Sequence, residues 1–287
     1  MLLVEVLLKG LINGCMFALM AIGLTLVYGL LRILHIAHAG LFTLGAYAGV
    51  ITANATGSIP LGMLAAVVSA GIAGMLIYRL AYQPVLKDPP HVPLIISIGL
   101  LIIMEDGFRI LFGGYGRSFD DNPYNTSTVT LSGMTFNYVE IAIVVSSVVL
   151  IGIFMVVVNR TRLGIGWRAT VSDPQMALSF GIRPIRVRYI NFFIGSALGA
   201  VAGMLFALLT NLVEPGMGGT LSYKGLAIVV LGGLGSVRGT LVASLILGVV
   251  EALGSLYVSD QLDPNSLGFL FLIVVLMIRP QGLFAKA

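Results

Sequence analysis

The stretch that decides the fold is MLLVEVLLKGLINGCMFALMAIGLTLVYGLL, residues 1–31, which is apolar from its second residue onwards. Crossing the hydrocarbon core of a bilayer takes about 20 predominantly apolar residues in a helix, and this stretch is longer than that. It has no basic cluster at its start, and no small-residue cleavage site follows a short apolar run. We therefore expect a retained first transmembrane helix and not a cleaved signal peptide.

The composition of the whole chain also indicates a membrane protein. Of its 287 residues, 58% are hydrophobic and 10% are charged, and the mean hydropathy is +1.03. Soluble domains carry about 25% charged residues, so this chain has too few to cover a surface exposed to water. We expect one membrane domain over residues 1–287, all-α and polytopic, with about eight transmembrane helices (about seven to nine), one or two of them broken or re-entrant.

Apolar runs suitable for membrane helices recur along the chain. The predicted segments are 4–30, 33–54, 59–79, 92–112, 138–158, 189–212, 219–236, 238–258 and 266–279. The segment 219–236 is short, rich in glycine and contains Lys224. It and 33–54 are therefore the candidates for partial or broken helices, since irregular backbone at membrane depth is tolerated only where protein or water covers it.

Basic residues decide the orientation of these segments, because positively charged connections stay on the cytoplasmic side. Most of the 16 Lys and Arg residues fall in alternate connections, with Arg117 as the main exception. The basic connections contain Arg32, Arg79, Lys87, Arg160, Arg162, Arg168, Arg183, Arg186, Arg188, Arg238, Arg279 and Lys286. The other connections contain Asp120, Asp121, Glu140, Glu214, Asp260 and Asp263. The pattern predicts an N-terminus outside the cell, a cytoplasmic C-terminus and a cytoplasmic segment at 159–188.

This cytoplasmic segment contains a short helix with a signal at each end. In SDPQMALSFGI, residues 172–182, Ser172 or Asp173 is a suitable N-cap and Pro174 takes the favoured first position. Gly181 favours termination of the helix after about two turns. The apolar face is predicted to consist of Met176, Ala177 and Phe180. Such a helix suits a cleft in a partner protein, whereas its basic flanks equally suit anionic lipid headgroups.

Glycine patterns predict close helix packing and irregular backbone. Gly195, Gly199 and Gly203 repeat every fourth residue, so they share one helix face where a neighbouring helix can approach closely. Two other stretches, Leu31–Gly49 and Val229–Thr240, combine glycine with basic or histidine residues between apolar runs. Glycine clusters of this kind predict tight turns or discontinuous helices, and solute pathways are often built from such places.

Polar residues inside the predicted segments are functional candidates, because they are costly in a bilayer. Glu105 and Arg109 have the spacing of an intrahelical ion pair, which we interpret as structural. Glu251 has no obvious partner nearby in sequence, and stands either at the outer interface in contact with water or on the lining of a pathway or subunit interface. The candidate pathway residues are Asn13, His38, Gly40, Gly232, Gly233 and Glu251.

Several motifs that would indicate chemistry do not occur in the sequence. No Gly-Lys pair precedes Ser or Thr, so there is no P-loop, and no zinc, HExxH or GxSxG motif is present. We expect no catalytic residue, cofactor or metal, and no nucleic-acid partner. Three classes remain: the membrane subunit of a transporter driven by a separate ATPase, a carrier or channel that works without ATP, and a membrane enzyme or scaffold.

The pattern R-A-x-x-x-D-x-x-M-A-x-x-x-G-I, from Arg168 to Ile182, resembles the cytoplasmic coupling motif of branched-chain amino acid ABC importer permeases of the LivH type. The opening GLINGCMFALMAIGLTLVYGLLRILHIAHAGLFTLGAY, the stretch GLAIVVLGGLGSVRGTLVASLILGVVEAL and the terminal MIRPQGLF are also similar to that family. Ala39-Gly40 stands where the family usually has His-Gly, with His38 one place earlier.

The resemblance implies a permease in the inner (plasma) membrane, with a homologous second permease, two ATP-binding cassette subunits and an extracytoplasmic substrate-binding protein as partners. It implies translocation of branched-chain or related neutral amino acids by ATP-driven alternating access. Urea or small amides, or transport without ATP, are the alternatives. It also implies contact with the ATPase by Asp173, Pro174, Met176, Ala177, Phe180, Gly181 and Ile182.

Overall fold

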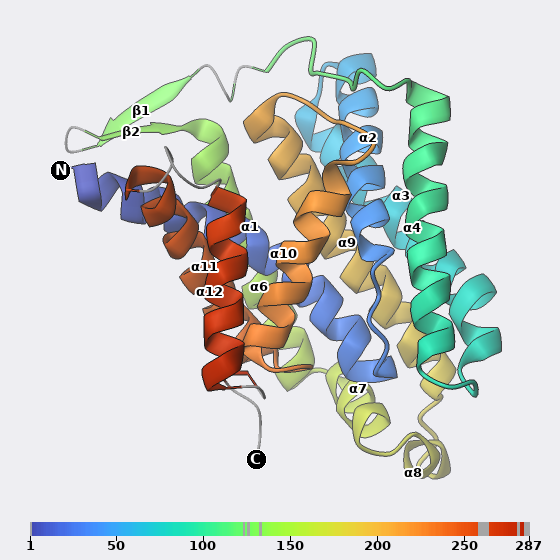
Figure 1. Cartoon of the computed structure of the whole chain (residues 1–287). Helices are drawn as coiled ribbons and strands as arrows, with labels where there is room; N and C mark the ends of the chain where they lie inside the picture. Colours follow the sequence, from blue (N-terminus) through green and yellow to red (C-terminus); the bar gives the residue numbers. More distant parts are fainter. Residues whose placement is uncertain are drawn as a thin grey trace.

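The computed structural model describes residues 2–122, 124, 127–131, 134–257, 264–279 and 282–283, and it is almost entirely helical (Figure 1). The helices are α1 (Leu2–Leu31), α2 (His38–Thr56), α3 (Ile59–Ile77), α4 (His91–Phe112), α6 (Tyr138–Arg160), α7 (Arg162–Ser172), α8 (Pro174–Ser179), α9 (Pro184–Thr210), α10 (Met217–Gly232), α11 (Val237–Tyr257) and α12 (Pro264–Ile278). The all-α polytopic fold class predicted from composition is confirmed.

Each predicted membrane segment coincides with a helix. Among the described residues, five helical stretches are long and apolar enough by themselves to cross a membrane: Leu3–Leu31, Ile59–Val85, Tyr138–Arg160, Pro184–Thr210 and Val237–Tyr257. The helix α10 is apolar but shorter. The stretch after α3 continues as a π-helical turn, Tyr78–Tyr82, and a 3-10 turn, Gln83–Val85.

The hairpin before α6 was not predicted from the sequence. A hairpin of β1 (Thr128–Leu131) and β2 (Met134–Asn137) precedes α6, with Val129 opposite Phe136 in antiparallel register. At the end of β2, Asn137 begins α6 through a capping box, in which its backbone N–H donates to the carboxylate of Glu140 at 2.9 Å. The hairpin therefore leads directly into a capped transmembrane helix.

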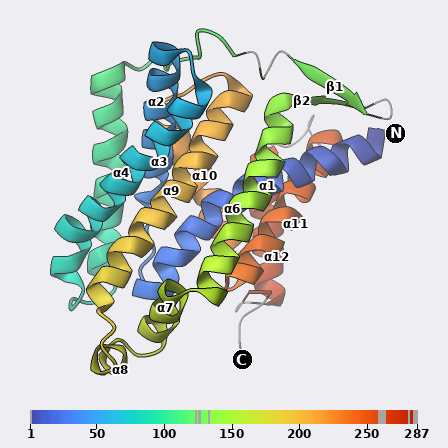
Figure 2. The ribbon, with the colours of Figure 1, turned by 180° about the vertical axis from the view of Figure 1, so that it is seen from behind.

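The two ends of the molecule are distinct (Figures 1 and 2). The N-terminus and the β1–β2 hairpin lie at one end, here called the hairpin end. The helices α7 and α8 and the last turn of α12 lie at the opposite end, here called the α8 end. This separation is what the predicted topology requires. Asp260, Asp263 and Lys286, which also entered that prediction, lie outside the described residues.

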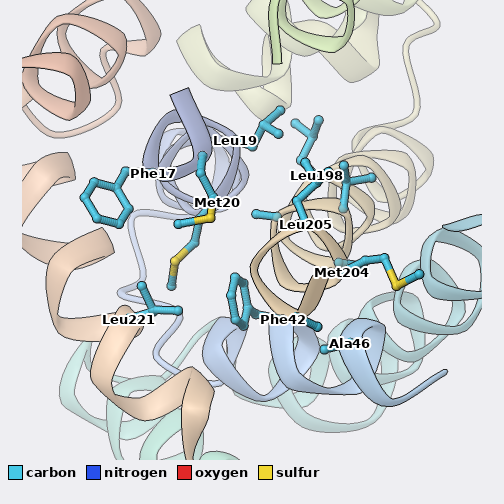
Figure 3. Close-up of a cluster of buried hydrophobic side chains, with 14 of the residues drawn as sticks. Phe17, Leu19, Met20, Phe42, Ala46, Leu198, Met204, Leu205 and Leu221 are labelled. Carbon is cyan, nitrogen blue, oxygen red and sulfur yellow. The ribbon is translucent and has the colours of Figure 1, made fainter. Parts of the chain in front are cut away.

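The glycine stripe of α9 packs at the centre of the bundle, as predicted. A Cβ added at Gly195 would lie 2.9 Å from the carbonyl of Gly23 in α1, and one at Gly203 would overlap the carbonyl of Phe42 in α2. Side chains of α1, α2, α9 and α10 converge beside this stripe (Figure 3). The labelled members are Phe17, Leu19, Met20, Phe42, Ala46, Leu198, Met204, Leu205 and Leu221.

One of the two predicted broken regions is confirmed in position. Between α1 and α2, residues 32–37 leave the helix and run into the interior, where Ile33, His35 and Ala37 are buried (Figure 1). The helix α2 therefore begins inside the molecule. In Val229–Thr240 the structure has the tight turn and not the discontinuous helix, because α10 ends at Gly232 and α11 begins at Val237 at the α8 end.

Candidate functional site

The short helix α8 begins and ends where the sequence predicted. A carboxylate oxygen of Asp173 accepts hydrogen bonds from the backbone N–H groups of Gln175 at 2.8 Å and Met176 at 3.0 Å. Pro174 is the first residue of the helix. At the other end Gly181 adopts φ +81°, and the N–H of Ile182 donates to the carbonyl of Ala177 at 3.0 Å. This closure satisfies a carbonyl of the last turn and fixes the length of the helix.

The apolar surface of α8 differs in one respect from the prediction. Met176 is 56% exposed and Phe180 is 78% exposed, but Ala177 is only 3% exposed and faces the protein. Ala177 therefore does not share their face. Leu178, which the sequence analysis did not single out, is 60% exposed. The exposed apolar surface of α8 consists of Met176, Leu178 and Phe180.

The neighbouring helix α7 was missed because glycines and arginines give it a polar sequence. The hydroxyl of Thr161 caps it by accepting from the N–H of Gly164 at 3.3 Å. Arg168 donates to the carbonyl of Val158 in α6. Trp167 extends from α7 towards Gly29 of α1, where an added Cβ would lie 3.6 Å from the indole. Through these contacts α7 links α8 to the transmembrane helices α1 and α6.

A second set of contacts runs from α9 to the buried connection between α1 and α2. At the start of α9, Tyr189 donates to the side-chain oxygen of Gln83 at 3.1 Å, and its ring meets Tyr78 edge-on at 5.0 Å. Tyr78 and Tyr82 both belong to the π-helical turn after α3, and the Tyr82 hydroxyl lies 2.7 Å from Nδ1 of His35. A π-helical turn is rare and is often found at functional sites. Nothing in the sequence alone indicates this arrangement.

Two predictions about charged residues within the helices need correction. Glu251 of α11 does have a partner: its carboxylate lies 2.8 Å from the ammonium of Lys224 in α10. Both side chains are largely buried, with relative exposures of 9% and 13%. The predicted pair of Glu105 with Arg109 is not formed, because Arg109 instead pairs with Asp106 at 3.0 Å on an exposed face of α4.

The structure brings two of the predicted pathway residues together in a cavity of about 320 Å³ between α1 and α11. It is lined by Val6, Lys9, Asn13, Glu251, Ala252 and Ser255. All six positions lie towards the hairpin end of their helices (Figure 1). Asn13 and Glu251 are thus neighbours across a hollow, although they are distant in sequence.

The other four predicted pathway residues lie elsewhere. The buried ring of His38 fills a slot between Gly23 and Gly199, where an added Cβ would come within 2.9 Å and 2.8 Å of it. Gly40 packs against Met104 of α4. Gly232 packs against the first turn of α11, and Gly233 turns the chain with φ +94°. These glycines have packing and turn roles at their positions.

A further cavity of about 300 Å³ opens at the hairpin end. It lies where α2 leads into α3, beside Asp120, Asp121 and Tyr124. Asn54 holds the loop in place, because its amide donates to the carbonyl of Ser118 at 3.0 Å and accepts from the N–H of Asp120 at 3.2 Å. Within the part of the chain that the structure describes, no three His, Cys, Asp or Glu side chains gather closely enough to hold a metal ion.

Comparison with known proteins gives consistent matches over nearly the whole chain. A family model described as the permease component of a branched-chain amino acid transport system matches residues 6–279. The high-affinity branched-chain amino acid transport system permease protein BraD of Pseudomonas aeruginosa is 32% identical, over 98% of this chain and 95% of its own. LivH of Escherichia coli K12, with the same description, is 30% identical, over 97% of this chain and 94% of its own. LivM of Salmonella typhimurium is 28% identical, over 93% of this chain and 67% of its own.

Proposed function

This chain belongs to the family of branched-chain amino acid transport system permease components, and from that premise we propose how it imports its solute. It is a membrane-spanning permease subunit of an ABC importer, a multi-pass protein of the inner membrane and not an enzyme. ATP hydrolysis belongs to separate ATP-binding subunits. Its solutes are branched-chain or related neutral amino acids, with urea or small amides as the alternative within the same family.

The partners follow from the same membership. The chain is similar both to LivH and to LivM, which are permeases of the same transport system by name, and this supports pairing with a homologous second permease. Two ATP-binding cassette subunits and an extracytoplasmic substrate-binding protein complete the proposed assembly. The cavity beside Asp120 and Asp121 at the hairpin end is a suitable place for delivery of solute.

The observation that carries the coupling proposal is the exposed apolar surface of α8. Met176 and Leu178 project from a helix of six residues that is held against α7 and α9, and Phe180 projects from the residue directly after it. A rigid, short helix with large apolar side chains suits a cleft in another protein, where such side chains supply most of the binding energy. We assign this surface to the contact with the ATPase.

Charge distribution supports an orientation with α8 in the cytoplasm. Connections at the α8 end contain Arg32, Arg79, Lys87, Arg160, Arg162, Arg183, Arg186, Arg238 and Arg279, whereas those at the hairpin end contain Asp120, Asp121 and Glu214 together with the basic Arg117. Under the positive-inside rule, the N-terminus then lies outside and the C-terminus in the cytoplasm. This places α8 on the side where an ATPase operates.

Alternating access would begin with a movement of α8 when the ATPase pair closes. The contacts of Trp167 with α1, and of Tyr189 with the turn after α3, carry this movement into the bundle. The hydrogen bond between Tyr82 and His35 continues it to the buried connection between α1 and α2. Because α2 begins inside the molecule at that connection, a shift there changes access to the interior.

The test is a double substitution on the exposed surface of α8. Met176→Glu with Phe180→Glu leaves every arginine in place but puts charge where the ATPase would bind, and burying an unpaired charge is costly. We expect normal membrane insertion, loss of ATPase co-purification and no uptake. The matched control is Thr128→Glu with Thr130→Glu, which adds two charges to exposed polar positions of β1 at the hairpin end, far from the proposed ATPase contact.

The control should insert, co-purify with the ATPase and transport. If the Met176 and Phe180 double variant also retains its ATPase and its uptake, α8 is a lipid anchor and the docking proposal is wrong. ATP-independent flux by the purified chain alone in liposomes would instead favour a secondary transporter.

A further inference from the structure

The helix α4 stands at the edge of the molecule and packs on the bundle through one of its faces (Figures 1 and 2). On that face, the rings of Phe108 and Phe112 lie against Tyr47 of α2, with ring centroids 5.5 Å and 4.4 Å apart. Met104 fills the space beside Gly40 of α2. The opposite face of α4 is exposed, and it carries both apolar and charged side chains.

Two charged residues lie on this exposed face. Asp106 is 56% exposed and Arg109 is 61% exposed, and the guanidinium of Arg109 donates to the carboxylate of Asp106 at 3.0 Å. Five isoleucines share the face at helical spacing: Ile95, Ile98, Ile102, Ile103 and Ile110. These seven residues are here called the outer face of α4.

The charged pair lies within the apolar part of the helix. With 22 residues, α4 is about 33 Å long, close to the thickness of the hydrocarbon core. Asp106 lies about 9 Å before the last residue, Phe112. Ile110 is exposed between the pair and the hairpin end, and Ile102 is exposed on the other side of it. Ionised side chains at such a depth are costly in contact with lipid.

The exposed faces of α3 and α6 have a different composition. No charged residue occurs in α3, and α6 has charge only in its first and last turns, at Glu140 and Arg160. Leu64 of α3 and Val148 of α6 are 59% and 64% exposed on these uncharged surfaces. Such surfaces suit lipid tails. The outer face of α4 instead requires polar groups opposite Asp106 and Arg109.

We propose that the outer face of α4 is the surface on which this chain meets the second permease, with Asp106 and Arg109 inside that interface. The inference rests on the proposed function, which includes a homologous second permease, and it assigns that partner to one helix. Lipid tails are as apolar as isoleucine, so polar contacts and close packing decide where membrane helices associate. The outer face of α4 offers both.

A homologous subunit fits this face because it can match the depth of the charged pair. The guanidinium of Arg109 has five N–H donors, and its hydrogen bond to Asp106 uses one of them. Two homologous subunits related by a two-fold axis place the same surface of each against the other. Equivalent positions of the two chains then lie at the same depth in the bilayer. We therefore expect the second permease to present polar side chains opposite Asp106 and Arg109.

The test is site-specific photo-crosslinking in the complete importer, assembled with its second permease, ATPase and binding protein in proteoliposomes. The variant Ile103→p-benzoylphenylalanine carries the crosslinker on the outer face of α4, at a position that is 69% exposed. Illumination should join this chain covalently to the second permease. The control is Val148→p-benzoylphenylalanine on α6, which is similarly exposed and should be joined to lipid and not to the second permease.

A second experiment removes the charges without adding a bulky group. Asp106→Leu with Arg109→Leu gives α4 an apolar outer face, so the chain should still insert. Polar groups of the second permease would then be buried without partners, which is costly, and we expect recovery of that subunit with the tagged chain to fall about tenfold.

The control for this experiment is Glu5→Leu with Lys9→Leu, which removes the exposed ion pair at the start of α1. Because α1 has 30 residues and is about 45 Å long, its first turns can lie outside the hydrocarbon core. Recovery of the second permease should be unchanged in this control.

The other outcomes contradict separate parts of the argument. An Ile103 variant that is crosslinked only to lipid, or a Val148 variant that is crosslinked to the second permease, would place the interface elsewhere. Unchanged recovery after the loss of Asp106 and Arg109 would show that the pair does not face that subunit. If the bulky group at Ile103 prevents assembly of an inserted chain, and the same group at Val148 does not, the interface is supported.

Transport is measured separately, as ATP-driven uptake of labelled leucine and labelled urea by the unmodified complex. If neither solute is taken up, the proposed function is wrong, whichever helix is crosslinked to the second permease. If uptake is normal and α4 is not crosslinked to that subunit, the importer stands and the interface on α4 is wrong.

Discussion

Asp173 shows how much one side chain contributes to α8, the proposed coupling helix. Its carboxylate accepts from two backbone N–H groups at the start of α8, a helix of only six residues. Helices this short do not form in isolation, so their caps decide whether they form at all. Asp173→Ala should cost about 0.5–2 kcal/mol of local helix stability.

The consequence is measurable as weaker stimulation of the ATPase and slower uptake by the Asp173→Ala complex. The matched control is Asp173→Asn, because asparagine is an equally good N-cap and should retain both activities. Unchanged coupling in the alanine variant would mean that the shape of α8 is fixed by its contacts with α7 and α9 and not by its cap.

Replacing glycine by alanine is expected to have opposite effects on stability at two positions of the bundle. A Cβ at Gly203 would overlap the backbone carbonyl of Phe42, which cannot move without shifting α2. Gly203→Ala should therefore destabilise the protein by about 1–3 kcal/mol, as overpacking does. Gly107, in α4, has nothing within 4 Å of an added Cβ.

Gly107→Ala is the matched control, and it should leave stability unchanged or raise it, since alanine favours a helix more than glycine does. Thermal unfolding of the two purified variants in the same detergent checks the difference. Equal melting temperatures would show that the close approach of α9 to α2 tolerates a methyl group.

Among the elements, the transmembrane helices were predictable and several connections were not. A membrane helix can be predicted from an apolar run, because the thickness of the bilayer sets its length and the hydrocarbon around it requires apolar side chains. The helix α7 lacks that signal, since it lies at the end of the bundle and contains two glycines and two arginines. The hairpin β1–β2 is too short for an alternating pattern to stand out.

The candidate site was predictable only where its determinants are local. The cap, first residue and glycine terminator of α8 lie within ten residues of one another, so the sequence shows them together. The partner of Glu251 is 27 residues away on another helix, and the cavity with Asn13 depends on the packing of α1 against α11. Spacing along the chain carries no information about such contacts. The exposure of Leu178 likewise depends on how α8 rests on α7 and α9.

At the scale of the whole molecule, the two ends of the helix bundle differ in chemistry, and we propose a different partner for each end. The hairpin end carries Asp120, Asp121 and the nearby cavity, while the α8 end carries most of the arginines and the exposed apolar surface. The proposed binding protein and the proposed ATPase would therefore act on opposite ends of the chain without competing. In this proposal, solute has to cross the molecule from the hairpin end to the α8 end.

This polarity can be tested by labelling single cysteines in intact cells. Cys15, the one native cysteine, is replaced by alanine, and cysteine is placed at Ser179 on α8 or at Asp121 at the hairpin end, both exposed positions. A membrane-impermeant maleimide should label the Asp121 variant in intact cells and the Ser179 variant only after the membrane is opened. Because α8 is proposed to enter the ATPase, the presence of that subunit should slow labelling at Ser179 and leave Asp121 unaffected. Labelling at Ser179 from outside would reverse the orientation and remove α8 from the reach of any ATPase, whereas cytoplasmic labelling that the ATPase does not slow would retain the topology and place the docking surface elsewhere.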